Sequence, residues 1–148
     1  MELEIYTDGA SRGNPGHAGI GIIILDKNGK IIEQSGEYIG QTTNNVAEYK
    51  GLVSGLKIAK KYLPCSVTVH LDSELVVRQL QGKYRTKDQT LKAYFEFANQ
   101  MLSEFDKFEI KYVPREKNKA ADKLANQAID KAANKKQLVP ESQLMLKF

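Results

Sequence analysis

Apolar and polar residues alternate at the start of the chain, over residues 3–7, and this period of two is typical of a β-strand. A nearly continuous run of β-branched and apolar residues over 18–26 predicts a second, buried strand, and residues 31–39 predict a third. Between them, the Asn28-Gly29 pair is typical of a type I′ hairpin turn, whose two central residues have positive φ angles. The first three strands are therefore predicted to form an antiparallel meander.

The hydrophobic period changes after the third strand. Apolar residues recur at intervals of three and four from Tyr49 to Leu63, which predicts a helix that Pro64 ends. Residues 42–45 supply the polar side chains that commonly cap a helix N-terminus. The same criteria predict the remaining elements: a strand over 66–71, helices over 74–80 and 90–105, a strand over 108–113 and a last helix over 120–133.

This order of elements predicts an α/β fold. A meander followed by strand–helix–strand crossovers gives a five-stranded mixed sheet, with three antiparallel and then two parallel strands, and with helices on both faces. The first, fourth and fifth strands should run in the same direction. Their carboxyl ends then meet at one edge of the sheet, which is where open α/β sheets usually bind ligands.

The composition is that of one globular domain. The chain has 148 residues, of which 41% are hydrophobic and 27% charged, an ordinary balance for a single folded domain. No apolar run approaches the ~20 residues of a membrane helix, and the acidic residues 1–4 do not resemble a signal peptide. The single cysteine, Cys65, excludes an intramolecular disulfide. We therefore expect a cytoplasmic protein without a membrane anchor.

The positive charge is concentrated late in the chain. The net charge is +4, and residues 107–136 contain nine basic and four acidic side chains. Such a segment is typical either of a binding site for a polyanion or of a solvent-exposed, lysine-rich helix face. The charge distribution alone leaves both interpretations open.

Four acidic residues are expected near one edge of the predicted sheet. Asp8 and Asp72 follow the first and fourth strands, whereas Glu48 and Asp122 lie early in the first and last helices. Adjacent strands are ~4.8 Å apart, so carboxylates at their ends repel one another unless a cation intervenes. Clustered carboxylates are ligands that suit Mg²⁺ or Mn²⁺.

Each acid also has a purely structural interpretation. Glu48 could form a capping box with Asn45, and Asp72 could cap the helix that follows it. Asp8 could be a turn residue, and Asp122 could complement a helix dipole. Four separate explanations of this kind do not account for the convergence of all four acids on one edge.

Four segments carry a resemblance to a known family. They are Tyr-Thr-Asp-Gly-Ala-Ser-Arg-Gly-Asn-Pro-Gly at 6–16, Thr-Thr-Asn-Asn-Val-Ala-Glu at 42–48, Leu-Asp-Ser at 71–73 and Val-Pro-Arg-Glu-Lys-Asn-Lys-Ala-Ala-Asp-Lys-Leu-Ala at 113–125. With these motifs in this order, the sequence resembles a type 1 ribonuclease H, with the ribonuclease H-like fold, over residues 2–135.

The resemblance implies an endonuclease that hydrolyses the RNA strand of RNA–DNA hybrids and leaves 5′-phosphate and 3′-hydroxyl ends. It implies two Mg²⁺ ions per site when substrate is bound, with Mn²⁺ as a substitute, and it leaves double-stranded RNA open as a further substrate. Two-metal phosphoryl transfer needs a cluster of carboxylates of this kind. The catalytic, metal-binding residues of the family fall on Asp8, Glu48, Asp72 and Asp122.

The resemblance also implies which residues contact the nucleic acid. Backbone amides and short polar side chains suit recognition of the 2′-hydroxyl of RNA. The matching positions are Gly9, Ser11, Gly13, Asn14, Thr43, Asn44, Asn45, Arg115 and Asn118. A role in turns and helix caps is compatible with the glycines and asparagines of this set, because tight turns let the backbone come close to a ligand.

Two departures from the family pattern affect the expected mechanism. Many members carry a mobile histidine in the segment 113–119, where this chain has Arg115 and no histidine. A guanidinium can position a phosphate but cannot take up a proton, so we expect activation of water by the metals without a protein base. His17 is expected to be a partly ordered loop residue rather than a catalytic group, and His70 a packed or partly exposed side chain rather than a ligand.

The second departure follows Asp72. Several bacterial relatives insert a basic, tryptophan-bearing helix there, whereas this chain has no tryptophan and a short connection over 81–87. The sequence is therefore interpreted as a member that lacks the basic protrusion helix. The candidate phosphate contacts in this connection are Lys83, Arg85 and Lys87.

Two other functions are compatible with the fold. One is a catalytically silent domain that binds hybrids or double-stranded RNA, but a pure binding domain gains nothing from carboxylates placed beside phosphates. The other is a different nuclease, such as a resolvase or integrase, but the asparagine-rich motifs that match 2′-hydroxyl contacts argue against it.

We expect the catalytic domain to span residues 1–137. The remaining residues, 138–148, form a C-terminal tail whose apolar side chains favour folding back onto the domain. No long hydrophobic edge requires a partner, so a monomer is expected.

The missing basic helix predicts weak hybrid binding with a shallow salt dependence. Each phosphate contact contributes about −0.9 to the slope of log affinity against log salt concentration on duplex DNA. A titration of hybrid binding at several salt concentrations measures this slope. A steep slope of about −5 to −9, which corresponds to six to ten phosphate contacts, would contradict the prediction.

Overall fold

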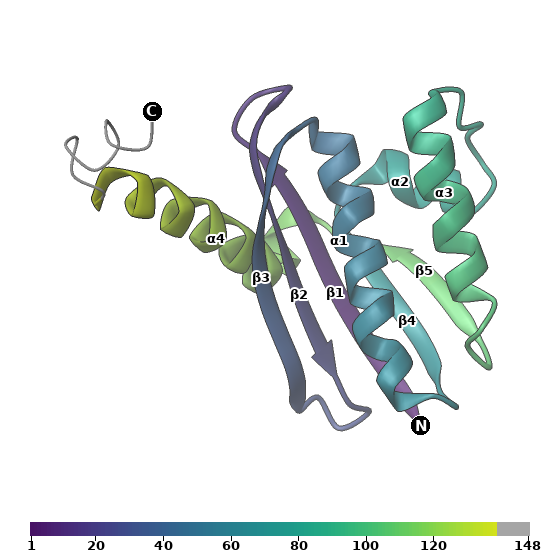
Figure 1. The fold of residues 1–148 in the computed structure, drawn as a ribbon. Coiled ribbons are helices and arrows are strands. Elements are labelled where there is room, and N and C mark those ends of the chain that lie inside the picture. Colours follow the sequence, from purple (N-terminus) through teal and green to yellow (C-terminus); the bar gives the residue numbers. More distant parts are fainter. Residues whose placement is uncertain (139–148) are drawn as a thin grey trace.

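The computed structural model describes residues 1–138, which form one five-stranded sheet and four α-helices (Figure 1). The strands are β1 (Glu2–Ser11), β2 (Gly16–Leu25), β3 (Ile31–Thr42), β4 (Ser66–Leu71) and β5 (Phe108–Tyr112). The helices are α1 (Asn44–Ala59), α2 (Glu74–Leu80), α3 (Gln89–Leu102) and α4 (Lys119–Leu138), with 3₁₀ turns at Lys60–Tyr62 and Arg115–Lys117. The predicted order of elements is confirmed.

Two further expectations from the sequence concern membrane-spanning helices and the C-terminal tail. No helix within residues 1–138 is long and apolar enough to cross a membrane. The predicted tail falls, apart from Leu138, outside the described residues, and so does the expectation that it folds back.

β1 is the central strand of the sheet, whose order is β3-β2-β1-β4-β5. It pairs antiparallel with β2 and parallel with β4, while β2 pairs antiparallel with β3 and β4 parallel with β5. The predicted mixed sheet and its strand directions are therefore confirmed. The parallel pairing of β1 with β4 stops at Tyr6 and His70, so Asp8 and Asp72 lie just beyond the point where the two strands separate.

Helices cover both faces of the sheet, as predicted (Figure 1). α1 packs on β1 and β2, and α3 packs on α1, whereas α4 crosses β1, β2 and β3 on the other face. Residues two apart on a strand face the same side of the sheet. Accordingly, Ile5 and Thr7 of β1 both point toward Gly55 of α1. The largest fully buried side chains of the core are Tyr49, Leu3, Ile5, Ile20, Ile22, Ile24, Leu52, Leu56, Leu71, Leu102, Val69 and Val76.

The prediction of a type I′ turn between β2 and β3 is wrong. Gly29 has a φ of +81°, but Asn28 does not have a positive φ. The Asp26 carboxylate instead accepts hydrogen bonds from the backbone N–H groups of Asn28 at 2.9 Å and Lys30 at 3.0 Å. This side chain stabilises a turn in which a single glycine takes the left-handed conformation.

Two helix boundaries also differ from the prediction. α3 ends at Leu102, with Ser103 as its C-cap, rather than at residue 105. α1 begins at Asn44, as the cap candidates at 42–45 predicted, and the hydroxyl of its cap Thr43 accepts the N–H of Val46 at 3.3 Å. α4 runs beyond residue 133 because no Gly or Pro interrupts the sequence before Pro140.

Two glycines allow helices to approach the sheet closely. A Cβ atom on Gly9 of β1 would lie 2.1 Å from the carbonyl carbon of Ala47 in α1. A Cβ atom on Gly21 of β2 would lie 1.9 Å from the carbonyl oxygen of Ala121 in α4. Because Gly21 pairs with Asp8 across the sheet, the two contacts bring both helices to the part of β1 that carries Asp8.

We predict that Gly9→Ala destabilises the protein by more than about 3 kcal/mol, beyond the usual range for an added methylene in a packed site. The added methyl group would collide with backbone atoms of Ala47 and Glu48, which cannot rotate away. Unfolding by urea or heat measures the loss.

Gly29→Ala is the control for this prediction. Its Cβ atom would meet no atom within 4 Å, but the φ of +81° makes the backbone strained, at a cost of about 1–2 kcal/mol. Equal losses in the two variants would contradict the close packing of α1 on β1.

Candidate metal centre and nucleic-acid interface

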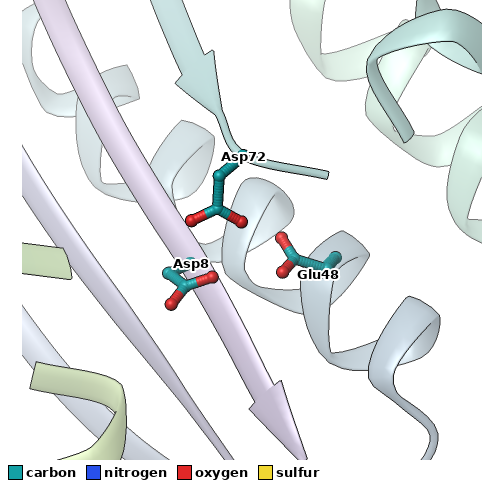
Figure 2. Close-up of side chains that lie close together, drawn as sticks. All are labelled: Asp8, Glu48 and Asp72. Atoms are coloured by element: carbon teal, nitrogen blue, oxygen red, sulfur yellow. The ribbon is translucent and has the colours of Figure 1, made fainter. Parts of the chain in front are cut away.

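Three acidic side chains from three different elements meet at the edge of the sheet (Figure 2). Asp8 comes from β1, Glu48 from α1, and Asp72 from the residue that follows β4. One carboxylate oxygen of each lies within 4.8 Å of the corresponding oxygens of the other two. The structure therefore brings together three of the four acids that the sequence placed at this edge.

Local structure removes two of the purely structural interpretations of these acids. The N-terminal cap of α1 is Thr43, so Asn45 lies inside the helix and does not form a capping box with Glu48. The cap of α2 is Ser73, whose hydroxyl accepts the N–H of Val76 at 3.3 Å. The carboxylates of Glu48 and Asp72 are thus not used as helix caps.

Burial and mutual repulsion change how these groups ionise. Asp8 and Glu48 are 5% and 3% exposed, whereas Asp72 is half-buried. Burial, followed by the charge of Asp72, raises the pKa of Asp8 to about 8. Burial, followed by the charges of Asp8 and Asp72, raises the pKa of Glu48 well above its ordinary value. The protein alone therefore does not compensate the negative charge of this cluster.

The cluster has the chemistry of a divalent-cation site. All three residues offer carboxylate oxygens, which are the hard ligands that such ions prefer. One oxygen of Glu48, Oε2, is buried and has no hydrogen-bond partner, and a buried polar oxygen without a partner is costly. A cation held by Asp8, Glu48 and Asp72 would provide that partner and relieve the repulsion.

Asp122 lies beside this group rather than within it. It is half-buried in the first turn of α4, and it contributes to the raised pKa of Asp8. Its Oδ1 accepts a hydrogen bond from the side-chain amide of Asn126 at 3.1 Å. Within residues 1–138, the set of mutually close ligand atoms contains the other three acids and not Asp122.

Several of the predicted substrate-binding residues gather where the β1–β2 loop meets the start of α1. Ser11 donates a hydrogen bond to the carbonyl oxygen of Thr42 at 2.8 Å, and Asn14 accepts one from the N–H of Asn44 at 3.2 Å. Gly13 has a φ of +143°, a conformation that favours glycine. Two segments about thirty residues apart in the sequence thus form one polar surface.

The remaining predicted residues lie in different surroundings. Thr43 and Asn45 are half-buried at the start of α1, and Arg115 is exposed in the turn before α4. Gly9 is buried against α1, so the structure gives it a packing role whatever else it contacts. Asn118 is only 2% exposed, and its side chain contacts protein atoms.

Sequence reasoning missed the connection between Asn118 and the acidic cluster. Its side-chain amide donates hydrogen bonds to Oδ2 of Asp72 and to the carbonyl oxygen of Thr7, both at 2.9 Å. These partners are 46 and 111 residues away along the chain. No local pattern signals such a contact, because it depends on how α4 approaches the sheet.

Both histidines lie outside the group of close carboxylates, although His17 belongs to β2 rather than to a loop. His17 is exposed, with Nδ1 2.7 Å from the hydroxyl of Tyr38. His70 is buried, stacks on the ring of Tyr6 and places Nε2 3.1 Å from a carboxylate oxygen of Glu4. It is a packed side chain of the sheet.

The central strand is paired antiparallel on one side and parallel on the other, with carboxylates gathered at its end, and this arrangement matches that of a ribonuclease H-like domain. A family model described as "Reverse transcriptase-like" matches residues 6–128. The chain belongs to this family and, within it, to the type 1 ribonucleases H, which the following relatives represent.

Ribonuclease HI of Halobacterium salinarum is 42% identical over 130 residues, which are 88% of this chain and 65% of that protein. A bifunctional protein of Mycobacterium tuberculosis is 41% identical over 134 residues, which are 90% of this chain and 37% of that protein. The chain thus spans between about a third and two thirds of the length of these curated relatives.

Solved structures give the same assignment. The crystal structure of RNase H1 from the halophilic archaeon Halobacterium salinarum matches with a TM-score of 0.86 and 40% identity, over 88% of this chain and 99% of that one. LC11-RNase H1, whose crystal structure is of a complex with an RNA/DNA hybrid, matches with a TM-score of 0.85 and 45% identity, also over 88% and 99%.

The raised pKa of Asp8 predicts an unusual effect of pH on stability. Between its ordinary value of 3.8 and about 8, the folded protein holds a proton that the unfolded chain has released, so stability without metal falls as pH rises through this range. Asp8→Asn removes the titrating group. In EDTA we therefore expect the variant to have the higher Tm at pH 8, by about 2–8 °C, which corresponds to 1–2 kcal/mol in a chain of this size.

The difference should shrink at pH 5, where the carboxyl group of the original protein is neutral. Thermal unfolding at both pH values measures it. Glu109→Gln, at an exposed position of β5, is the control and should show no comparable gain. A Tm difference for Asp8→Asn that is the same at pH 5 and pH 8 would contradict the assigned pKa.

Proposed function

We propose that this chain is an endonuclease that hydrolyses the RNA strand of RNA–DNA hybrids by two-metal catalysis and leaves 5′-phosphate and 3′-hydroxyl ends. The observation that carries the proposal is the meeting of Asp8, Glu48 and Asp72 within 4.8 Å, with an unpartnered buried oxygen on Glu48. The hybrid bound to LC11-RNase H1, which is 45% identical, supports the choice of substrate.

Asp8, Glu48 and Asp72 hold the metal, and Asp122 completes the set of carboxylates when substrate is present. The natural ion is Mg²⁺, with two ions per site in the substrate complex and Mn²⁺ as a substitute, because hard oxygen ligands suit both. When bound, such ions supply an activated water and neutralise the charge of the departing 3′ oxygen.

The protein's own part is to position the substrate. The surface formed by the β1–β2 loop and the start of α1 presents Ser11, Gly13, Asn14, Asn44 and Asn45, which suit contacts to 2′-hydroxyl and phosphate groups. Gly9 contributes backbone groups and Thr43 a hydroxyl group to the same surface.

The guanidinium of Arg115 is exposed just before α4 and orients a phosphate without accepting a proton. Lys83, Arg85 and Lys87 are exposed in the connection between α2 and α3, where they contact further phosphates. A monomeric protein in the cytoplasm remains the expectation from the sequence, as does the lack of a basic protrusion helix.

We predict cleavage of an RNA–DNA hybrid in its RNA strand when Mg²⁺ or Mn²⁺ is added, and none of double-stranded DNA. End-labelled hybrid, double-stranded RNA and double-stranded DNA, incubated in parallel and resolved on a denaturing gel, measure this and settle whether double-stranded RNA is cut. Asp8→Asn should abolish cleavage yet retain hybrid binding, since it loses a ligand and also some repulsion of the phosphates.

Other outcomes identify the alternative functions. Cleavage of DNA would indicate a resolvase- or integrase-like nuclease, and tight hybrid binding without cleavage would indicate a silent binding domain. Full activity of Asp8→Asn would refute the role given to the carboxylates.

A further inference from the structure

Asn118 joins three parts of the protein that meet behind the acidic cluster. Its side chain is 2% exposed, and its Nδ2 group donates to Oδ2 of Asp72 and to the carbonyl oxygen of Thr7, both at 2.9 Å. The backbone carbonyl oxygen of Asn118 accepts the N–H of Asp122 at 3.1 Å, within the first turn of α4. One residue thus contacts the end of β4, the backbone next to Asp8, and the helix that carries Asp122.

The orientation of the amide follows from its partners. The carboxylate of Asp72 and the carbonyl of Thr7 are both acceptors here, so the NH₂ group must face them. Both of its hydrogen atoms are then used within the protein. The remaining atom, Oδ1, is buried and has no partner among the described residues.

These contacts replace pairing that the sheet lacks at this point. The ladder between β1 and β4 ends at Tyr6 and His70, one residue before Thr7 and two before Asp72. Beyond that pair, the two strands have no further paired residues within the described part of the chain. The amide of Asn118 bridges them there, between the residue before Asp8 and the side chain of Asp72.

We propose that Asn118 is a positioning residue for the metal centre, which sets the orientation of the Asp72 carboxylate and its distance from Asp8. The proposal rests on the metal-dependent function proposed above. It differs from the role implied by the family resemblance, in which Asn118 binds substrate, because a side chain this deeply buried has no free donor for a nucleic acid. Groups that orient metal ligands typically affect metal affinity or activity by 10–100-fold.

Asn118→Leu tests the proposal, since leucine has a similar branched shape and cannot donate a hydrogen bond. We expect the dissociation constant for Mn²⁺, measured by isothermal titration calorimetry without substrate, to rise about tenfold or more. Hybrid affinity, measured by fluorescence anisotropy in EDTA, should change by less than twofold. Should Asn118→Leu fail to fold, Asn118→Ser leaves space for a water and should give a smaller change in the same direction.

Gln79→Met is the matched control for loss of a buried amide. Gln79 is 4% exposed and accepts a hydrogen bond from the hydroxyl of Tyr49 at 2.6 Å. Its replacement should lower Tm and leave Mn²⁺ affinity within twofold of the original. A similar loss of Mn²⁺ affinity in Gln79→Met would mean that general destabilisation explains the effect, and it would overturn the proposal.

Two further outcomes would overturn it. Unchanged Mn²⁺ affinity in a folded Asn118 variant would exclude a positioning role. Weakened hybrid binding in EDTA with unchanged Mn²⁺ affinity would assign Asn118 to the substrate instead. If the original protein itself does not bind Mn²⁺, the proposed function fails, and this result is distinguishable because it does not depend on Asn118.

Discussion

Repulsion between carboxylates held in a small and partly dry space is the constraint on which the rest of the structure depends. Asp8 and Glu48 are buried, and Asp72 lies within 4.8 Å of both. Each group would be more stable alone in water, and burial disfavours its ionised form. The cluster exists only because three well-packed elements approach one another for reasons unrelated to charge, and the site is therefore maintained at the expense of stability.

The hydrophobic core is the part of the molecule that resists this repulsion. Tyr49, the neighbour of Glu48, is fully buried, so its packing in the core holds this part of α1 against the sheet. Gly9 and Gly51 let α1 lie against the backbone around Asp8. On the other face, Gly21 lets α4 approach at the level of Asp8. Small residues at these points set the geometry of the charges.

Element types and strand directions could be predicted from the sequence because they depend on local periodicity and on the handedness of crossovers. The meeting of Asp8 with Asp72 followed from the rule that parallel strands place their ends together. The hairpin at Asp26 was mispredicted, because two hydrogen bonds to one carboxylate decided its geometry. The contact of Asn118 with Asp72 could not be predicted, since it arises from the docking of α4.

The position of Asn118 just before α4 makes the acidic cluster depend on a late segment of the chain. A chain still attached to the ribosome and ending before residue 118 already contains Asp8, Glu48 and Asp72. It lacks the amide that ties the end of β4 to β1, and it lacks the helix that carries Asp122. The arrangement around the acidic cluster is therefore complete only when α4 has docked on the sheet.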